Sequence, residues 1–169
     1  MSASKGQLLV GSTAVFGYRG NMASIERGIY IGSFEACDSI QFHFNRVIHI
    51  YHESQPGICC SCGSPPSGRD LILNWKEHDP VTQDMFDSVW NFVRADQDSR
   101  VLIHCAAGIG RSAHMSVIAL VARGCPLGRA VGLVTEAQLS RYHSRVVPNW
   151  DRNNLYEIDK FICSAHASA

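Results

Sequence analysis

The sequence predicts a single α/β domain in which helices flank a central, mostly parallel sheet. The chain has 169 residues, which is enough to bury one core and short for two domains. Short apolar runs alternate along it with stretches of helical periodicity, a pattern typical of α/β folds. Hydrophobic residues make up 46% and charged residues 18% of the chain, and no apolar run is long enough to cross a bilayer. We therefore expect a globular protein.

The predicted strands are short apolar runs at 29–31, 46–50, 71–73 and 100–104. The last run, RVLIH, is bounded by charge and suits a central buried strand. The predicted helices carry apolar residues three and four positions apart, and they begin after Ser33, at Thr82, at Ser112, at Leu127 and near Leu155. We expect the Ser33 side chain to cap the first helix and Gly124 to end the apolar helix 112–123.

The domain is expected to span 25–163. Residues 1–24 show no clear periodicity, so their structure stays open, and 164–169 form a short tail. Between Glu53 and Asp70 the chain is rich in proline, serine and glycine, which predicts a loop. No internal repeat and no domain linker is visible.

The net charge and the cysteine content argue against several classes of protein. Fifteen Lys and Arg balance fifteen Asp and Glu, so the formal net charge is zero, and no global field favours nucleic acid or an anionic membrane. Seven cysteines form an odd, irregularly spaced set, which argues against a disulfide framework. The N-terminus is a poor signal peptide and the chain end SAHASA is no prenylation motif. We expect free thiols and a cytoplasmic location, with the nucleus as an alternative; the oligomeric state stays open.

The segment HCAAGIGRS at 104–112 lies where a strand gives way to a helix. Backbone N–H groups in such a tight loop point inward, and the helix adds its positive N-terminal end, so the junction forms an anion site. Gly108 and Gly110 allow the loop to curl around a tetrahedral oxyanion, and Arg111 offers two charged donors to phosphate oxygens. The positive potential favours the thiolate form of Cys105, which predicts a nucleophile aimed at bound phosphorus.

This segment resembles the phosphate-binding loop of the protein tyrosine phosphatase superfamily, in particular that of the small dual-specificity phosphatases. RGIYIGS at 27–33 and RVIHI at 46–50 resemble early strands of those domains, and Arg141 and Pro148-Asn149 resemble motifs of their closing segment. The tract WKEHD resembles the acid loop of the phosphatases of regenerating liver. The family's usual Gly-Phe after Asn149 is absent.

The resemblance implies roles for individual residues. Cys105 attacks phosphorus, Asp79 acts as general acid and then as general base, and the Ser112 hydroxyl assists the departing thiolate. His104 orients the loop through a buried hydrogen bond, and Asn149 buttresses it. The residues that would bind the substrate phosphate are Ala106, Ala107, Gly108, Ile109, Gly110 and Arg111.

Structural explanations compete with some of these roles. Asp79 or Ser112 could cap a helix, and Asn149 could simply be a turn residue. Glu77 and Asp84 are remote substitutes for Asp79 as the acid.

The remaining cysteines and histidines suggest no metal centre. Cys59, Cys60 and Cys62 lack a second ligand pair at zinc spacing, so we expect loop thiols, with redox protection of Cys105 by one of them as an alternative. Cys37, Cys125 and Cys163 are expected to be packing residues, as is His114. His43, His49, His52, His78 and His143 show no ligand spacing in the sequence. We expect metal-free chemistry and no cofactor.

The resulting expectation is a protein phosphatase acting on phosphotyrosine, with phosphoserine and phosphothreonine as an open question, through a cysteinyl-phosphate intermediate. Its partners would be phosphorylated proteins, with no nucleic acid and no membrane anchor. A phosphoinositide phosphatase is the second enzyme hypothesis, although Ala106, Ala107 and Ile109 stand where lysines would meet a polyanionic head group. An RNA 5′-triphosphatase is a third hypothesis, and a non-catalytic phosphate-binding scaffold is a fourth.

Overall fold

The computed structural model describes residues 22–40, 43–52, 68–106, 109–141, 148 and 150–168. Within these residues five strands form one sheet: β1 (Met22–Glu26), β2 (Ile29–Gly32), β3 (Arg46–Tyr51), β4 (Asp70–Asn74) and β5 (Val101–His104). Five helices accompany them: α1 (Phe34–Ile40), α2 (Gln83–Arg94), α3 (Arg111–Ala122), α4 (Leu127–Arg141) and α5 (Arg152–Ala167). Every predicted strand and helix is therefore confirmed.

The sheet has the order β1-β2-β5-β3-β4. Strand β1 pairs with β2 in antiparallel fashion, and the other three pairings are parallel, so the sheet is mostly parallel as predicted. Strand β5 lies at the centre, and all four of its residues are buried. The carboxyl end of this strand, between two parallel neighbours, is where an α/β fold places its ligand site.

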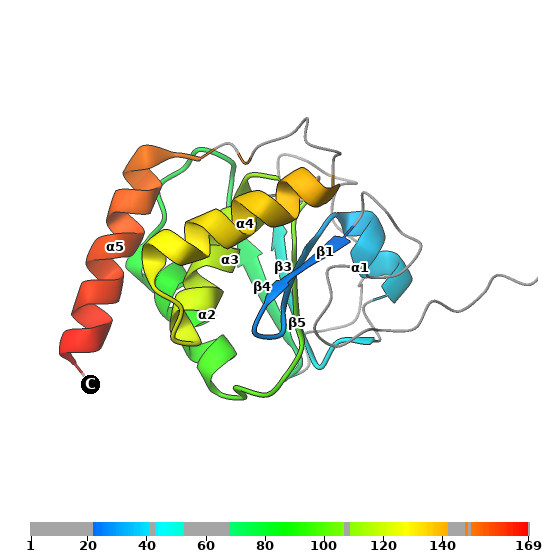
Figure 1. Ribbon diagram of the computed structural model, residues 1–169, viewed down its shortest axis with the longest axis horizontal. Coiled ribbons are helices and arrows are strands. Elements are labelled where there is room, and N and C mark those ends of the chain that lie inside the picture. Colours follow the sequence, from blue (N-terminus) through cyan, green and yellow to red (C-terminus); the bar gives the residue numbers. More distant parts are fainter. Residues whose placement is uncertain are drawn as a thin grey trace, which may run out of the picture.

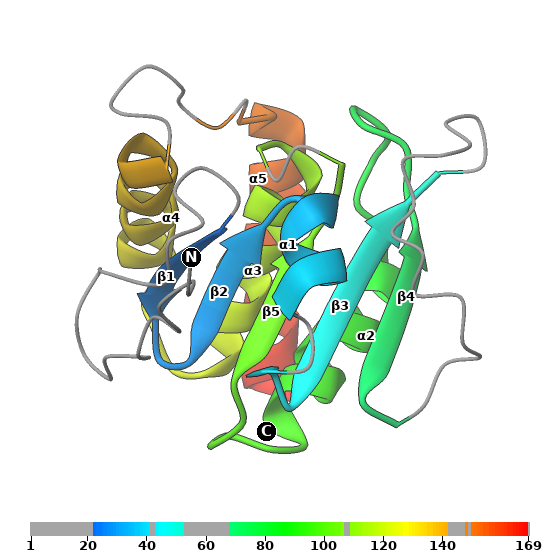
Figure 2. The same cartoon turned by 90° about the vertical axis from the view of Figure 1, so that its right-hand side faces the viewer.

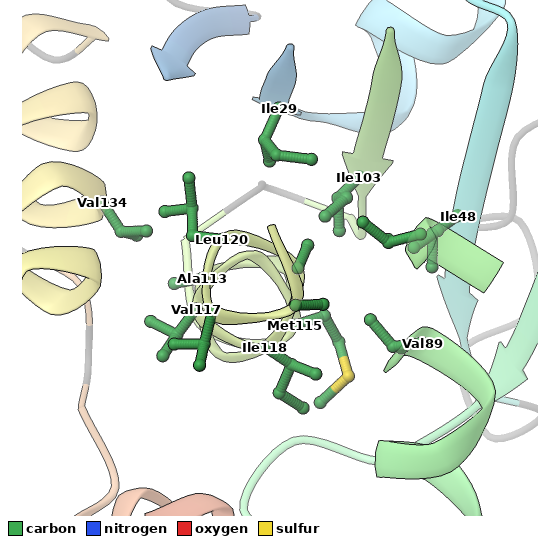
Figure 3. Close-up of a cluster of buried hydrophobic side chains, with 14 of the residues drawn as sticks. Ile29, Ile48, Val89, Ile103, Ala113, Met115, Val117, Ile118, Leu120 and Val134 are labelled. Atoms are coloured by element: carbon green, nitrogen blue, oxygen red, sulfur yellow. The ribbon is translucent and has the colours of Figure 1, made fainter. Parts of the chain in front are cut away.

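Helices cover the two faces of the sheet unequally. Figure 2 views the sheet with α1 in front of it, and Figure 1 shows α2, α3, α4 and α5 gathered on the other side. The larger face packs around α3, all of whose residues are buried. Figure 3 shows Ile29, Ile48 and Ile103 from three strands approaching this helix, with Val89 of α2 and Val134 of α4 on its flanks. Residues 113–122 are mostly apolar because the strands and the neighbouring helices contact α3 on all sides.

The α1 face has its own smaller apolar cluster, which contains Tyr30, Cys37, Phe44, Val47 and Leu102. Side chains along a strand alternate between the faces, so Leu102 and His104 of β5 belong to this face. Ile103 and Cys105 belong to the α3 core. Adjacent residues at the end of β5 therefore serve opposite sides of the sheet.

The start of α2 and the end of α3 lie where the sequence predicts them, whereas the predicted cap of α1 does not form. The Thr82 hydroxyl caps α2 by accepting from the backbone N–H of Met85 at 3.3 Å, and Gly124 follows α3 with φ of 85°. The expected side-chain cap at Ser33 is wrong, because the buried Ser33 hydroxyl makes no hydrogen bond among the described residues. Only its carbonyl contributes, accepting from Cys37 N–H at 3.2 Å.

The sequence did not indicate β1, whose residues MASIE pair with β2. Its start at Met22 lies inside the segment whose structure was left open, and α5 continues to Ala167, so regular structure extends beyond 25–163 at both ends. The described helices are all too short or too polar to span a bilayer.

Candidate active site

The site forms where β5 ends and α3 begins. Cys105 follows the last residue of β5, and Arg111 and Ser112 open α3. The Cys105 thiol lies 3.4 Å from the Ser112 hydroxyl, and the two side chains are 4% and 0% exposed. A thiolate at this position would accept a hydrogen bond from Ser112, which is a charge-assisted contact.

Arg111 is buried despite its charge, with 5% of its surface exposed. Its Nη1 donates to the Trp75 carbonyl oxygen at 3.2 Å. Burial of a guanidinium is costly unless its donors are satisfied, so this carbonyl stabilises the side chain at the mouth of the loop. The hydrogen bond also joins the loop at 105–111 to the tract WKEHD at 75–79.

The tract at 75–79 is held by two further side chains. Trp75 Nε1 donates to the Asp79 carbonyl oxygen at 3.0 Å. Asn154 of α5 donates to the same oxygen at 3.0 Å, and its own Oδ1 accepts from Val81 N–H at 2.7 Å. Asn154 is 3% exposed, so it clamps this turn from the inside. The backbone of Asp79 is therefore fixed while its side chain remains exposed.

The two acidic residues of this tract differ in position. A small cavity of about 10 Å³ is lined by Glu77, Gly110, Arg111 and His114 among others, and Asp79 is not one of its lining residues. A Cβ added at Gly110 would lie 2.5 Å from Glu77 Oε1, so the Glu77 carboxylate faces the start of α3. The Asp79 carboxylate makes no hydrogen bond or ion pair with the described residues. Asp79 does not cap α2, because Thr82 does.

His114 connects three segments around the same cavity. Its Nδ1 lies 2.9 Å from the Gly110 carbonyl oxygen, and its Nε2 accepts from Asp151 N–H at 3.2 Å. The ring packs edge-on against Trp75 and Trp150. Burial lowers the pKa of His114 below 6.5, so the neutral ring with a proton on Nδ1 is favoured. The expectation of internal packing is confirmed, and the ring in addition fixes the helix start.

A second polar chain supports the loop from α4. Gln138 is fully buried and its Nε2 donates to the Ile109 carbonyl oxygen at 3.5 Å. Arg141 is 4% exposed and donates to Gln138 Oε1 at 2.9 Å. Arg141 was singled out by resemblance, whereas Gln138 was not. The sequence signal that could have found it is its spacing, because Gln138 follows Ala130 and Val134 at intervals of four residues on the apolar side of this helix.

Behind the loop, His104 belongs to a cluster that the sequence did not indicate. His104 Nε2 lies 2.8 Å from His49 Nδ1, and His49 Nε2 lies 2.8 Å from Asp70 Oδ1. The Cys37 Sγ lies 3.7 Å from the same His49 Nδ1. The expectation that His49 belongs to no group of ligand-type residues is therefore wrong, and Cys37 is more than a packing residue. Four separate elements supply these side chains, so no spacing in the sequence could show them.

Several residues named by the sequence lie outside the described residues. They are Cys59, Cys60, Cys62, Ala107, Gly108, His143 and Asn149. Their roles stay predictions. Ala106, Ile109 and Gly110 lie at the two ends of the loop as expected, with the Ala106 carbonyl accepting from Phe34 N–H at 3.1 Å.

Known proteins share the loop region and the fold. Residues 71–141 match the family model described as protein-tyrosine phosphatase. None of the curated proteins matches the chain in sequence.

Three solved structures illustrate the shared fold. Human tyrosine phosphatase-like serine/threonine/tyrosine-interacting protein has 20% identity and a TM-score of 0.65, covering 89% of this chain and 100% of its own. Human DUSP28 has 16% identity and a TM-score of 0.60, covering 86% and 95%. PTPMT1 in complex with PI(5)P has 14% identity and a TM-score of 0.63, covering 87% and 97%.

At these identities the three structures establish the fold, while the matched segment contains the strand β5, the loop and α3. Residues 71–141 are thus similar to the protein-tyrosine phosphatase family, and the chain has the fold seen in the small dual-specificity phosphatases.

Proposed function

We propose that the protein hydrolyses phosphate monoesters on proteins, with phosphotyrosine as its first substrate class. The observation that carries this proposal is the pairing of a buried thiol with a hydroxyl at a helix start, Cys105 with Ser112, next to the buried cation Arg111. A helix N-terminus and a guanidinium stabilise an anion there, and the thiol is the nucleophile that would attack it.

The first step forms a covalent intermediate. The Cys105 thiolate attacks phosphorus, the S–P bond forms, and the bond from phosphorus to the ester oxygen breaks. Asp79, as a carboxylic acid, gives its proton to the departing oxygen. Arg111 and the loop N–H groups hold the non-bridging oxygens throughout, so charge that grows in the transition state meets fixed donors.

The second step returns the enzyme to its starting form. Asp79, now a carboxylate, takes a proton from a water molecule whose oxygen attacks phosphorus. The S–P bond breaks, inorganic phosphate leaves, and Ser112 donates a hydrogen bond to the thiolate that Cys105 regains. The electron pair of the S–P bond returns to sulfur, so the two steps together amount to hydrolysis of the ester.

The assignment of Asp79 rests on its place after β4 in a turn tied to the loop. The Arg111–Trp75 hydrogen bond and the Asn154 clamp hold this turn beside α3. Glu77 is the competing acid, since its carboxylate faces Gly110. The position of the Asp79 backbone supports its assignment, whereas the observed position of the Glu77 side chain supports Glu77 as the acid. Asp79→Asn and Glu77→Gln separate the two assignments.

The candidate substrates would require different amounts of positive charge on the protein around the loop. PTPMT1, whose fold is similar, was solved with PI(5)P, so a phosphoinositide is a second candidate substrate. A head group with several phosphates favours lysines around the loop, and this chain has Ala106, Ala107 and Ile109 there. An RNA 5′-triphosphate would favour a basic surface, which a net charge of zero does not provide. Phosphoproteins fit these residues best.

The decisive experiment compares two cysteine substitutions on an aryl phosphate substrate. Cys105→Ser should abolish turnover, with a loss of at least about 10⁴-fold, because a hydroxyl at this position is a far weaker nucleophile. Cys125→Ser is the matched control: that thiol is also buried, at 2% exposure, and burial raises its pKa. It should retain turnover. Equal activity of the wild type and Cys105→Ser would exclude Cys105 as the nucleophile and overturn the proposal, and no activity in the wild type would favour a phosphate-binding scaffold.

Substrate class is then tested with the same pair of proteins. Cys105→Ser should retain binding and trap its targets, because Arg111 and the loop are unchanged. We expect turnover of phosphotyrosine peptides by the wild type to exceed turnover of soluble phosphoinositides and of RNA 5′-triphosphates. A preference for either of the last two would assign the enzyme to that substrate class instead.

A further inference from the structure

The cluster on the α1 face joins ligand-type side chains from three elements. Cys37 comes from α1, His49 from β3 and His104 from β5, and all three are buried at 0%, 4% and 2% exposure. Their ligand atoms Sγ, Nδ1 and Nε2 all lie within 4.8 Å of one another. One thiol and two imidazoles are a donor set that zinc prefers among the common divalent ions.

The fold itself brings these residues together. His49 and His104 are register partners on adjacent parallel strands, so their side chains emerge on the same face. Helix α1 crosses that face, as Figure 2 shows. The hydrogen bond from Phe34 N–H to the Ala106 carbonyl at 3.1 Å anchors the start of α1 at the end of β5. Cys37, one turn further along the helix, is thereby held above the two rings.

Asp70 occupies the position of a supporting residue. Its Oδ1 lies 2.8 Å from His49 Nε2, and the Arg69 guanidinium lies 3.4 Å from the same carboxylate. A carboxylate at Nε2 places the ring proton there and leaves the Nδ1 lone pair directed at the cluster. Metal-ligating histidines are commonly oriented in this way. The Cys37 thiolate and the Asp70 carboxylate would also balance the charge of a divalent cation.

The single lone pair of His49 Nδ1 is contacted from two sides. It lies 2.8 Å from His104 Nε2 and 3.7 Å from Cys37 Sγ. The two ring nitrogens lie at hydrogen-bond distance in this arrangement, and a cation between the three atoms would bind each of them instead. In a tetrahedral zinc site two nitrogens lie about 3.4 Å apart and a nitrogen and a sulfur about 3.6 Å apart. The observed distances are within about an ångström of these values.

We propose that Cys37, His49 and His104 form a binding site for a zinc ion on the α1 face, with Asp70 orienting His49. Three protein ligands leave the fourth position for a water molecule. Binding breaks the hydrogen bond between the two rings and forms bonds from the metal to Sγ, Nδ1 and Nε2. The thiol proton of Cys37 goes to solvent. The Nε2 proton of His104 moves to its Nδ1, which lies 3.4 Å from the Cys105 carbonyl oxygen.

Occupancy of this site would therefore affect the residue beside the nucleophile. With metal bound, His104 Nδ1 carries a proton and donates to the backbone of Cys105. Without metal, the ring proton of His104 can instead lie on Nε2, where it is donated in a hydrogen bond to His49 Nδ1. The zinc site lies on the α1 face, whereas the phosphate site lies on the other face of the sheet. The peptide bond between His104 and Cys105 links the two sites.

Cobalt(II) is the probe for the experiment, because a thiolate bound to it gives a charge-transfer band and a tetrahedral site gives strong visible bands. The full chain carrying Cys105→Ser is used, so that the nucleophile itself does not bind the metal. We expect one equivalent of cobalt bound with both bands, and displacement by one equivalent of zinc. Absence of the charge-transfer band would overturn the proposal.

Substitutions in this background assign the ligands. Cys37→Ser should remove the charge-transfer band, and His49→Gln should weaken cobalt binding by at least about 10²-fold. Cys125→Ser, at a buried thiol outside the cluster, should leave both bands unchanged, as should joint replacement of Cys59, Cys60 and Cys62 by serine. A band that persists in Cys37→Ser, or that disappears in the triple variant, would place the metal elsewhere.

Asp70→Asn covers the case in which Cys37→Ser fails to fold, as judged by circular dichroism. Asp70 is not a ligand, so its replacement should keep the band positions while lowering cobalt affinity about 10–100-fold. An unchanged affinity in Asp70→Asn would contradict the role of this carboxylate and, with it, the proposed geometry.

Discussion

The two residues at the end of β5 belong to different environments although they are consecutive. Cys105 belongs to the α3 core, beside Ser112 and the helix start. His104 turns to the α1 face, where His49, Cys37 and Asp70 surround it. The thiol, hydroxyl and guanidinium of the first environment come from one continuous segment at 105–112, whereas the second environment combines side chains of α1, β3, β4 and β5. The difference teaches that one strand end can supply two different polar sites when its neighbours differ on the two faces.

This comparison also explains what the sequence could predict. Strands and helices were recognised because apolar residues recur at the right spacing, and the loop was recognised because its chemistry depends on neighbours in sequence. The cluster of His49 and His104 depends on the register of β3 against β5, which no local pattern encodes.

The same reasoning explains the errors. Strand β1 is not evident in the sequence because MASIE has no run of three apolar residues, and the strand is stabilised by its pairing with β2. The Ser33 cap was expected from residue type, but the chain turns so that only the Ser33 carbonyl reaches α1. Asn154, which clamps the turn at Asp79, lies on α5. Its role arises only from tertiary contact.

After Cys105→Ser, the largest effect that we predict on the catalytic face concerns the general acid. Asp79→Asn should lower kcat by about 10²–10⁴-fold, because the leaving oxygen then departs without a proton. The loss should shrink for substrates with good leaving groups. Glu77→Gln, the matched control in the same turn, should lower kcat by less than about 10-fold. Steady-state kinetics with a series of aryl phosphates measures both.

The reverse pattern would assign the acid to Glu77, and equal losses across all leaving groups would exclude Asp79 from proton transfer. Neither substitution should alter cobalt binding, because both residues lie on the α3 side of the sheet. A change in cobalt affinity would show that the two faces are less independent than the comparison implies.

A smaller effect is expected at the phosphate clamp. Arg111→Lys keeps the charge and loses the two-pronged geometry, so kcat/KM should fall by about 10²–10³-fold. Arg123→Lys offers a control, since Arg123 is also buried but bonds to the carbonyl oxygens of Arg27 and Asp96 away from the loop. It should affect stability and leave kcat/KM within about 3-fold. Full activity of Arg111→Lys would show that the loop N–H groups suffice for phosphate binding.

The smallest effect is a pH dependence of stability from His114. Its pKa in the folded protein is lowered below 6.5 by burial, so the unfolded chain binds more protons as the pH falls below that value. The free energy of unfolding should therefore decrease below about pH 6.5, by at most about 1.4 kcal/mol per pH unit for this group.

Urea unfolding of the wild type and His114→Gln at about pH 7.5 and about pH 5.5 measures this contribution. The variant should lose less stability than the wild type between the two values. His78→Gln, at an exposed histidine in the turn 77–79, should behave as the wild type. The same decrease in all three proteins would show that His114 does not titrate in this range.

The clamp formed by Asn154 has a consequence for the newly made chain. The loop at 104–112 and the turn at 75–79 leave the ribosome before α5, yet the turn gains its full set of hydrogen bonds only when Asn154 donates to the Asp79 carbonyl and accepts from Val81. We expect a nascent chain that ends before α5 to present the nucleophile without a correctly placed acid. Assembly of this site would thus wait until α5 has been synthesised and has packed against the turn.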